Sequence, residues 1–403
     1  MKAGWEVKSL GEIADIQSGS GFPEKYQGIS NHSIPFYKVS DMNLVGNERE
    51  MIFQNNTISE LVRTQLGASI FPEGSTIFPK IGGAIFTNKK RITSKDSCVD
   101  NNVMGAIPKK NKVDSQFLYY FFQSHDLVEF ANDAHLPSIR KTVVESWPIK
   151  IPLSITEQQR IVAILDRAFE GIAKACANAE QNLQNARALF ESHLQSVFTQ
   201  GDKGWQESKL DEVCNLITCG VAATPKYVDE SVGVPFLSAQ NVRDGEVVLD
   251  KYRYISKVFH QELTKKNKPT KGDVLYSRVG SKFGEAGVVE HEFEFSVYVS
   301  LTLIKPIPDK LDSYFLKYYL NSPLVKSLAL KSISSSGVPN LNVKDVREFP
   351  IKYPSISIQK EFVEEIYLLR KETQRLEALY QRKIALLGEL KKSLLQQAFA
   401  GEL

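Results

Sequence analysis

The chain has 403 residues, of which 42% are hydrophobic, so it is long enough for two packed domains and too apolar to be a disordered protein. Its net charge is only +3, and residues 1–155 carry 17 Lys and Arg against 16 Asp and Glu. Bulk charge therefore does not mark a nucleic-acid-binding protein, and any basic binding surface must be local.

The first predicted element is repeated. Gly4–Ile13, with the pattern Gly-Trp…Leu-x-Glu, returns 200 residues later as Gly204–Val213. Four further matches follow in the same order: 34–37 with 234–237, 74–78 with 272–276, 147–152 with 349–354, and 194–198 with 395–399. A period of this length indicates duplicated domains rather than a solenoid. Two similar surfaces in one chain suit a target with two halves, such as a DNA duplex with two half-sites.

The duplication predicts a globule, a helix, a second globule and a second helix, with borders at 1–155, 156–201, 202–356 and 357–403. Residues 34–39, 76–81, 234–239 and 273–276 have the apolar pattern of strands, and Phe117–Phe130 and Ser313–Leu330 have that of helices. We therefore predict an α+β fold with two similar mixed globules that are joined by two long helices.

The first long helix is predicted to begin at Thr156, because Thr156 and Gln159 form a capping-box pattern. From Ile161 to Leu189, apolar or small residues recur in alternating steps of four and three, which is coiled-coil spacing. Phe362 to Leu394 repeat this spacing. Asn182 and Lys383 are polar breaks that could fix the register.

Chain direction implies that these two helices pair antiparallel, in a pseudo-two-fold arrangement with a globule at each end. Each helix would be a rod of roughly 65 Å. The alternative is that each helix only covers its own globule.

Basic residues in glycine-containing loops are the first candidates for DNA binding, because a glycine lets the backbone approach a phosphate and Arg or Lys can bind phosphate or guanine. Ordinary solvated hairpins are the alternative for either loop alone. The candidates in the first globule are Lys80, Lys89, Lys90 and Arg91, and those in the second are Arg278, Ser281 and Lys282.

Further candidates lie after other strands and before the exit of each globule. Asn can pair with adenine through two hydrogen bonds, and the alternative is an Asn that caps a loop. These candidates are Lys38 and Arg140 in the first globule, and Gln240, Arg243, Asn340 and Asn342 in the second.

Catalytic and metal-binding motifs are missing from the sequence. It has no G-x-x-x-x-G-K-[ST] loop for a triphosphate, and Gly19-Ser20-Gly21 lacks the last glycine of a dinucleotide loop. The four cysteines form no CxxC pair. We therefore expect no metal, no cofactor and no enzymatic activity. The polar amino terminus and the short apolar runs predict a cytoplasmic protein that does not enter a membrane.

These features together resemble the specificity subunit of type I restriction-modification enzymes over essentially the whole chain. The resemblance rests on the two Gly-Trp…Leu-x-Glu openings and on Pro35-Phe36 and Pro235-Phe236. The segments Gly272–Arg278, Ile151–Val162 and Phe399–Leu403 carry the rest of it.

The resemblance implies that each globule is a target recognition domain that reads one part of a split double-stranded DNA site. The helices would set the spacing and dock two modification subunits, which carry S-adenosylmethionine and methylate adenine, and a restriction subunit would join them. Gln158, Arg160 and Gln359, near the helix starts, are the expected subunit-interface residues. The second helix departs from the family pattern, because Ser357-Ile358-Gln359-Lys360 replaces Thr-Glu-Gln-Gln.

Two other classes stay open at this point. One is a coiled-coil adaptor with protein-binding globules, which the weak net charge allows. The other is the DNA-reading half of a methyltransferase or nuclease, against which the missing cofactor motif argues.

Overall fold

The computed structural model describes residues 4–200, 204–222, 225–280, 283–332 and 340–403, in which two units of packed residues can be distinguished. Unit 1 comprises residues 1–179 and 382–403, and unit 2 comprises residues 180–381. Each unit therefore contains one globule and one end of both long helices, α5 (Ile155–Gln200) and α11 (Ile356–Ala400).

In unit 1 the predicted strands 34–39 and 76–81 are present as β3 and β6, in two different sheets. The larger sheet has the order β2-β9-β6-β7-β4, a smaller one has the order β5-β3-β8, and β1 pairs antiparallel with β10. The strands are β1 (Trp5–Ser9), β2 (Ala14–Ser18), β3 (Ile34–Tyr37), β4 (Glu50–Met51), β5 (Thr57–Ile58), β6 (Thr76–Pro79), β7 (Arg91–Thr93), β8 (Cys98–Val99), β9 (Val103–Pro108) and β10 (Pro148–Pro152).

Unit 2 repeats this plan. The orders β12-β21-β18-β19 and β13-β17-β14-β20 correspond to the two larger sheets of unit 1, and β11 pairs with β22 as β1 does with β10. The strands are β11 (Gln206–Lys209), β12 (Cys214–Cys219), β13 (Tyr227–Val228), β14 (Gly233–Leu237), β15 (Val242–Arg243), β16 (Glu246–Val247), β17 (Arg253–Ser256), β18 (Val274–Ser277), β19 (Ala286–Val288), β20 (Ser296–Val297), β21 (Leu301–Pro306) and β22 (Pro350–Tyr353).

Short helices pack on these sheets, and they agree with the two predicted helical segments. The helices of unit 1 are α1 (Leu10–Ile13), α2 (Glu60–Leu66), α3 (Ser115–Ser124) and α4 (Lys141–Ser146), with 3-10 turns at Glu24–Tyr26, Val39–Asn43, Gly82–Thr87 and Leu127–Phe130. Those of unit 2 are α6 (Leu210–Val213), α7 (Lys257–Asn267), α8 (Ser313–Asn321), α9 (Pro323–Lys331) and α10 (Val343–Arg347), with a 3-10 turn at Ala239–Asn241.

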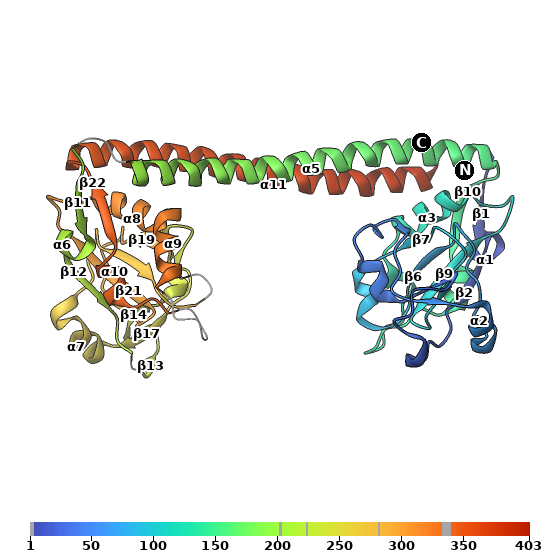
Figure 1. The fold of residues 1–403 in the computed structure, drawn as a ribbon, viewed down its shortest axis with the longest axis horizontal. Helices are drawn as coiled ribbons and strands as arrows, with labels where there is room; N and C mark the ends of the chain where they lie inside the picture. Colours follow the sequence, from blue (N-terminus) through green and yellow to red (C-terminus); the bar gives the residue numbers. More distant parts are fainter. Residues whose placement is uncertain (1–3, 201–203, 223–224, 281–282, 333–339) are drawn as a thin grey trace. The chain divides into compact units, whose positions relative to one another are not determined.

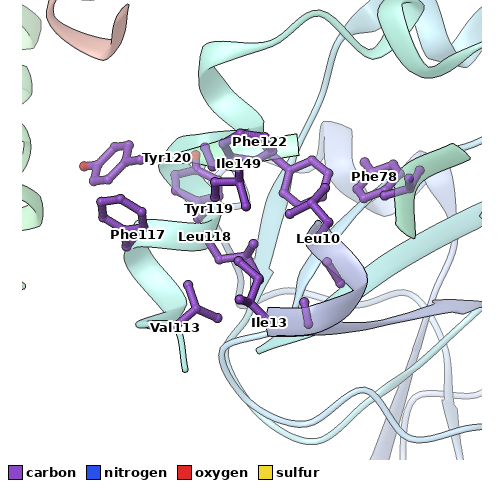
Figure 2. Close-up of a cluster of buried hydrophobic side chains, with 14 of the residues drawn as sticks. Leu10, Ile13, Phe78, Val113, Phe117, Leu118, Tyr119, Tyr120, Phe122 and Ile149 are labelled. Carbon is purple, nitrogen blue, oxygen red and sulfur yellow. The ribbon is translucent and has the colours of Figure 1, made fainter. Parts of the chain in front are cut away.

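Helix α3 lies in the middle of the unit 1 core. Asp114 caps it by accepting hydrogen bonds from the N–H groups of Gln116 and Phe117, at 3.0 and 3.1 Å. Residues 117–122 are all buried, because α3 is covered on one side by the sheet and on the other by the long helices. Figure 2 shows its aromatic side chains beside Leu10 and Ile13 of α1, with the Tyr120 hydroxyl turned away from this cluster.

The long helices close the core of each unit. In unit 1, Ile161 and Leu165 of α5 lie in one cluster with Leu395 and Ala398 of α11. In unit 2, the opposite ends meet: residues 190, 194 and 198 of α5 cluster with Ile366 of α11. Within each unit the two helices therefore run antiparallel, as predicted (Figure 1). They also cover the globules, but because they pair with each other, the alternative that each helix only covers its own globule is wrong.

Three details of the helix predictions are wrong. Helix α5 starts at Ile155 rather than at Thr156. The hydroxyl of Ser154, in place of that of Thr156, caps the helix by accepting a hydrogen bond from the Glu157 N–H at 3.4 Å. Leu189 and Leu390 are 65% and 47% exposed, so they lie outside the seam. The seam leaves strict heptad spacing there because a straight α-helix drifts away from a 3.5-residue repeat, and because the helix ends must also pack on a globule. Asn182 and Lys383 are exposed as well, so they are not the polar breaks within the seam that were predicted to fix the register.

Candidate nucleic-acid interface

Several chain segments of unit 1 meet at one edge of its sheets. The N–H of Ser20 donates to the Val99 carbonyl at 3.0 Å, and the N–H of Lys80 donates to the Asn102 carbonyl at 2.9 Å. The carbonyl of Lys80 in turn accepts from Ile139 at 2.9 Å. We call this set the unit 1 edge, and it consists of Gly19–Ser20, Lys38, Lys80, Asp100–Asn102 and Ser138–Arg140.

Unit 2 builds an equivalent edge, in which Arg278 makes the same two backbone bonds as Lys80. The N–H of Arg278 donates to the Ser300 carbonyl at 3.0 Å, and the Arg278 carbonyl accepts from Leu341 at 2.8 Å. The N–H of Val299 donates to the Val221 carbonyl at 3.0 Å. The unit 2 edge consists of Gly220–Val221, Ser238–Asn241, Arg278, Tyr298–Ser300 and Asn340–Asn342. The equivalence extends residue by residue, with Lys80 in the place of Arg278.

A glycine occupies the tightest point of each edge. A Cβ atom on Gly19 would lie 2.0 Å from the Asp100 carbonyl oxygen, and one on Gly220 would lie 1.9 Å from the Val297 carbonyl oxygen. Both distances are far below van der Waals contact, so only glycine fits at either position. The loop after β2 or β12 is therefore held directly against the turn before β9 or β21.

The unit 1 edge carries three of the predicted DNA-binding residues, Lys38, Lys80 and Arg140. Lys38 and Lys80 are half-buried and Arg140 is exposed. The ammonium of Lys38 donates to Gln27 Oε1 at 2.8 Å. Asp100, at the same edge, is buried, and this burial raises the pKa of its carboxyl group. The edge therefore combines three cations with one carboxylate that is shielded from solvent.

The other predicted residues of unit 1 lie around the start of β7. Lys89 contacts Asn43 Oδ1, and Arg91 donates to the Met42 carbonyl at 3.1 Å. Lys90 is only 1% exposed and its ammonium donates to Asn88 Oδ1 and to the His125 carbonyl, at 2.5 and 2.8 Å. Burial lowers the pKa of Lys90 to about 8. Lys90 is thus a structural lysine that cannot reach a ligand in this conformation, which corrects its assignment as a DNA-binding residue.

In unit 2, Asn340 and Asn342 lie exposed at the edge, and Gln240 is exposed beside them on the turn after β14. Asn342 also caps α10, since its Oδ1 accepts from the Lys344 N–H at 3.0 Å. Arg243 forms an ion pair with Asp250 at 2.7 Å. Predicted residues Ser281 and Lys282 lie outside the described residues.

Arg278 has a different position from the one expected of a DNA contact. It is 9% exposed, and its guanidinium donates to the carbonyls of Leu341 and Val299 and to Asn340 Oδ1, at 2.7, 3.1 and 3.1 Å. These hydrogen bonds satisfy the guanidinium within the protein. Arg278 therefore connects segments of the edge, instead of making the direct DNA contact that the sequence suggested.

The expected subunit-interface residues divide into two kinds. Gln158 and Gln359 are fully buried, so neither can contact another subunit in this conformation. Gln158 accepts from the Asp114 N–H at 2.7 Å and donates to the Pro152 carbonyl at 2.9 Å. Gln359 repeats this with Asp312 and Pro354, both at 2.8 Å. Arg160 is exposed and donates to the Leu403 carbonyl at 2.9 Å.

The sequence analysis did not predict that Asp100 and Asn102, or the equivalent residues Tyr298 and Ser300 of unit 2, belong to the edges. No local pattern marks them, since they join the edge through backbone bonds to strands far away in sequence. Across the described ranges, no group of three or more His, Cys, Asp or Glu side chains could hold a metal ion. None of the helices in the same ranges is both long and apolar enough to cross a bilayer.

This twofold architecture agrees with known proteins. A chain from a structure that concerns complex assembly and conformational transition of the type I R-M system matches with a TM-score of 0.80 and 18% identity, over 100% of this chain and 99% of that one. The HsdS subunit from Thermoanaerobacter tengcongensis matches with a TM-score of 0.64 and 19% identity, over 100% and 98%. At these identities the likeness shows the fold alone.

Sequence relatives point the same way. The specificity subunit of type I restriction enzyme EcoBI from Escherichia coli is 23% identical over 99% of this chain and 86% of its own length. That of EcoDI, also from Escherichia coli, is 30% identical over 72% of this chain and 70% of its own length. The type I restriction modification DNA specificity domain matches residues 2–179 and again residues 202–385. The chain therefore belongs to the family of type I restriction-modification specificity subunits, as its sequence patterns predicted.

Proposed function

We propose that each unit reads one half of a bipartite DNA site through its edge, and that the chain itself is non-catalytic. The observation that carries this proposal is that the two edges join equivalent segments, with the same two backbone bonds at Lys80 and Arg278, but carry different side chains. Lys38, Lys80 and Arg140 in unit 1 stand where unit 2 has Ser238, Arg278 and Asn342. A common frame with different donors and acceptors suits two surfaces that read different bases.

In this proposal the antiparallel helix pairs fix the gap between the half-sites and dock two modification subunits, which methylate adenine. A restriction subunit would join the same complex. The exposed apolar residues of α11, such as Leu386 and Leu390 at 51% and 47%, and the exposed Arg160 support such docking. They replace the buried Gln158 and Gln359 as interface candidates.

The test is to co-express the chain with its modification subunit and to map methylated adenines across a genome. A split motif with a fixed gap is the expected result. If the subunits co-purify and no motif appears, the proposed reading of DNA by the edges is wrong. If they do not associate, a coiled-coil adaptor with protein-binding globules becomes the better hypothesis.

Changing the helix lengths tests the role of the helices in spacing. Seven residues inserted into α5 after Glu180, together with seven inserted into α11 before Arg382, should change the gap in the methylated motif. Each inserted residue lengthens a helix by about 1.5 Å, so a heptad adds about 10 Å, or roughly three base pairs at about 3.4 Å each. Insertion into α5 alone should abolish methylation, because the seam then loses its register. An unchanged gap in the doubly lengthened protein would contradict the spacing role.

A further inference from the structure

Arg278 connects three segments of the unit 2 edge through one side chain. Its Nε donates to the Leu341 carbonyl at 2.7 Å, and its two terminal nitrogens donate to the Val299 carbonyl and to Asn340 Oδ1, each at 3.1 Å. The side chain itself extends from the end of β18. Three hydrogen bonds from a rigid, permanently charged group fix these segments more firmly than bonds from neutral side chains would.

The connection extends to a fourth segment. The residue after Val299 is Ser300, and its hydroxyl accepts a hydrogen bond from the Ala239 N–H at 2.9 Å. The turn that contains Gln240 is therefore linked, through Ser300, to the carbonyl that Arg278 binds. All the exposed polar candidates of this edge, Gln240, Asn340 and Asn342, thus lie on segments that Arg278 contacts directly or through one residue.

Unit 1 lacks this connection. Lys80 has the equivalent backbone position, but no hydrogen bond from its ammonium to Ile139 or to the turn before β9 is present in the part of the chain that the structure describes. That turn is held instead by Asp100, whose carboxylate accepts from the N–H and the side-chain amide of Asn102 at 3.0 and 3.3 Å. A lysine at this position is therefore compatible with the same backbone frame.

We propose that Arg278 is a positioning residue that determines the base specificity of unit 2 by fixing the Asn340–Asn342 segment and the Gln240 turn. This inference rests on the proposed function. Selection of a base requires donors and acceptors that are held in place before binding, because an adaptable surface can satisfy several bases. Arg278 acts through other residues, so its loss should change which bases are accepted more than how tightly the backbone is bound.

The test compares the Arg278→Lys variant with the wild-type chain, each in complex with its modification subunits. The affinity for cognate DNA is measured against that for DNA with single base changes in either half-site. One wrong base pair ordinarily weakens binding by about tenfold or more. The variant should lose most of this discrimination, about tenfold, in one half-site and retain it in the other, because lysine keeps the charge but can make only part of the three-way connection.

Two control variants distinguish positioning from direct contact. Lys80→Arg makes the reverse change at the equivalent place, and it should leave the half-site affected by Arg278→Lys unchanged. Asn340→Ala removes one partner of the guanidinium on an exposed residue and should relax the same half-site to a smaller extent. If Arg278 acts through Asn340, the double variant should be no worse than Arg278→Lys alone.

The possible outcomes separate this inference from the function on which it rests. If the wild-type complex yields no split motif, the proposed function fails. If it yields a split motif but Arg278→Lys and Asn340→Ala both discriminate as the wild type does, the positioning role is wrong. Strictly additive effects of the two substitutions would also overturn it, because Arg278 would then act independently of the segment that it contacts.

Discussion

The two units hold their globules against the long helices in different ways. In unit 1, Asp166 of α5 forms an ion pair with Arg49 at 2.9 Å and accepts a hydrogen bond from the hydroxyl of Tyr120. Arg49 also lies over the Tyr119 and Tyr120 rings, with centroid distances of 5.7 and 5.4 Å. A polar connection thus joins globule and helix beside the apolar core.

In unit 2 the place equivalent to Asp166 is taken by Tyr367, which is 57% exposed. Lys317 of α8, which replaces Tyr119, pairs within its own globule with Glu246 at 3.0 Å. A hollow of about 420 Å³ lies here, lined by residues of α5, α8 and α11 that include Tyr318, Tyr367 and Arg370. Both units therefore attach the globule to the helices through an apolar core and a buried glutamine, Gln158 or Gln359, and unit 1 adds the Arg49–Asp166 ion pair.

The largest effect is expected where the two units agree. Replacing Gln158 or Gln359 by Ala should destabilise the corresponding unit by about 4 kcal/mol, because each change leaves a cavity and several buried backbone groups without a partner. Urea unfolding followed by tryptophan fluorescence can measure this unit by unit. In a Trp205→Phe background the remaining tryptophans, Trp5 and Trp147, report on unit 1; in a Trp5→Phe, Trp147→Phe background Trp205 reports on unit 2. Clearly unequal losses would show that the two glutamines are not equivalent.

Lys90 should make the stability of unit 1 depend on pH in a way that unit 2 does not share. Its pKa in the folded state is about 8, below the ordinary value of 10.5, so the charged lysine is penalised by folding. The penalty is fully present below about pH 8 and disappears as the unfolded lysine loses its proton near pH 10.5. Over this window the wild type should gain about 3 kcal/mol relative to Lys90→Met. Lys89→Met controls for net charge, and a constant difference between wild type and Lys90→Met from pH 7 to pH 10 would contradict the prediction.

A smaller effect is expected from the polar bridge. Asp166→Ala should destabilise unit 1 by about 1 kcal/mol, since the pair is partly solvated and such bridges contribute little. Tyr367→Ala, the matched change in unit 2, should cost less because that side chain is mostly exposed. Hydrogen exchange in α3 and α8 of the intact chain measures both effects. Faster exchange in α8 after Tyr367→Ala than in α3 after Asp166→Ala would reverse the assignment of the more firmly attached globule.

Much of the fold could be predicted from the sequence because its signals are local or repeated. The duplicated openings, the apolar strands and the long seams each need only short-range or periodic patterns. The start of α5 and the ends of its seam could not be predicted in detail, because Ser154 competes with Thr156 as a cap and Leu189 follows the heptad but faces solvent.

The candidate interface was harder to predict than the fold. Their place in glycine-containing loops suggested that Lys90 and Arg278 are exposed basic residues, yet both are buried and donate to the carbonyls of His125 and Leu341, 35 and 63 positions away. The family resemblance suggested Gln158 and Gln359 as subunit-interface residues, but both are buried. Their role depends on helix starts at Asp114 and Asp312, and those contacts exist only after folding.

The glycines at the two edges bear on how such a protein could acquire a new target. Gly19 and Gly220 leave no room for any side chain, so substitution there would displace the backbone that carries every neighbouring donor and acceptor. The exposed side chains around them have no such backbone restriction. Evolution can therefore explore new recognition chemistry by single steps at positions such as Arg140 or Asn342, while these two positions stay closed to change.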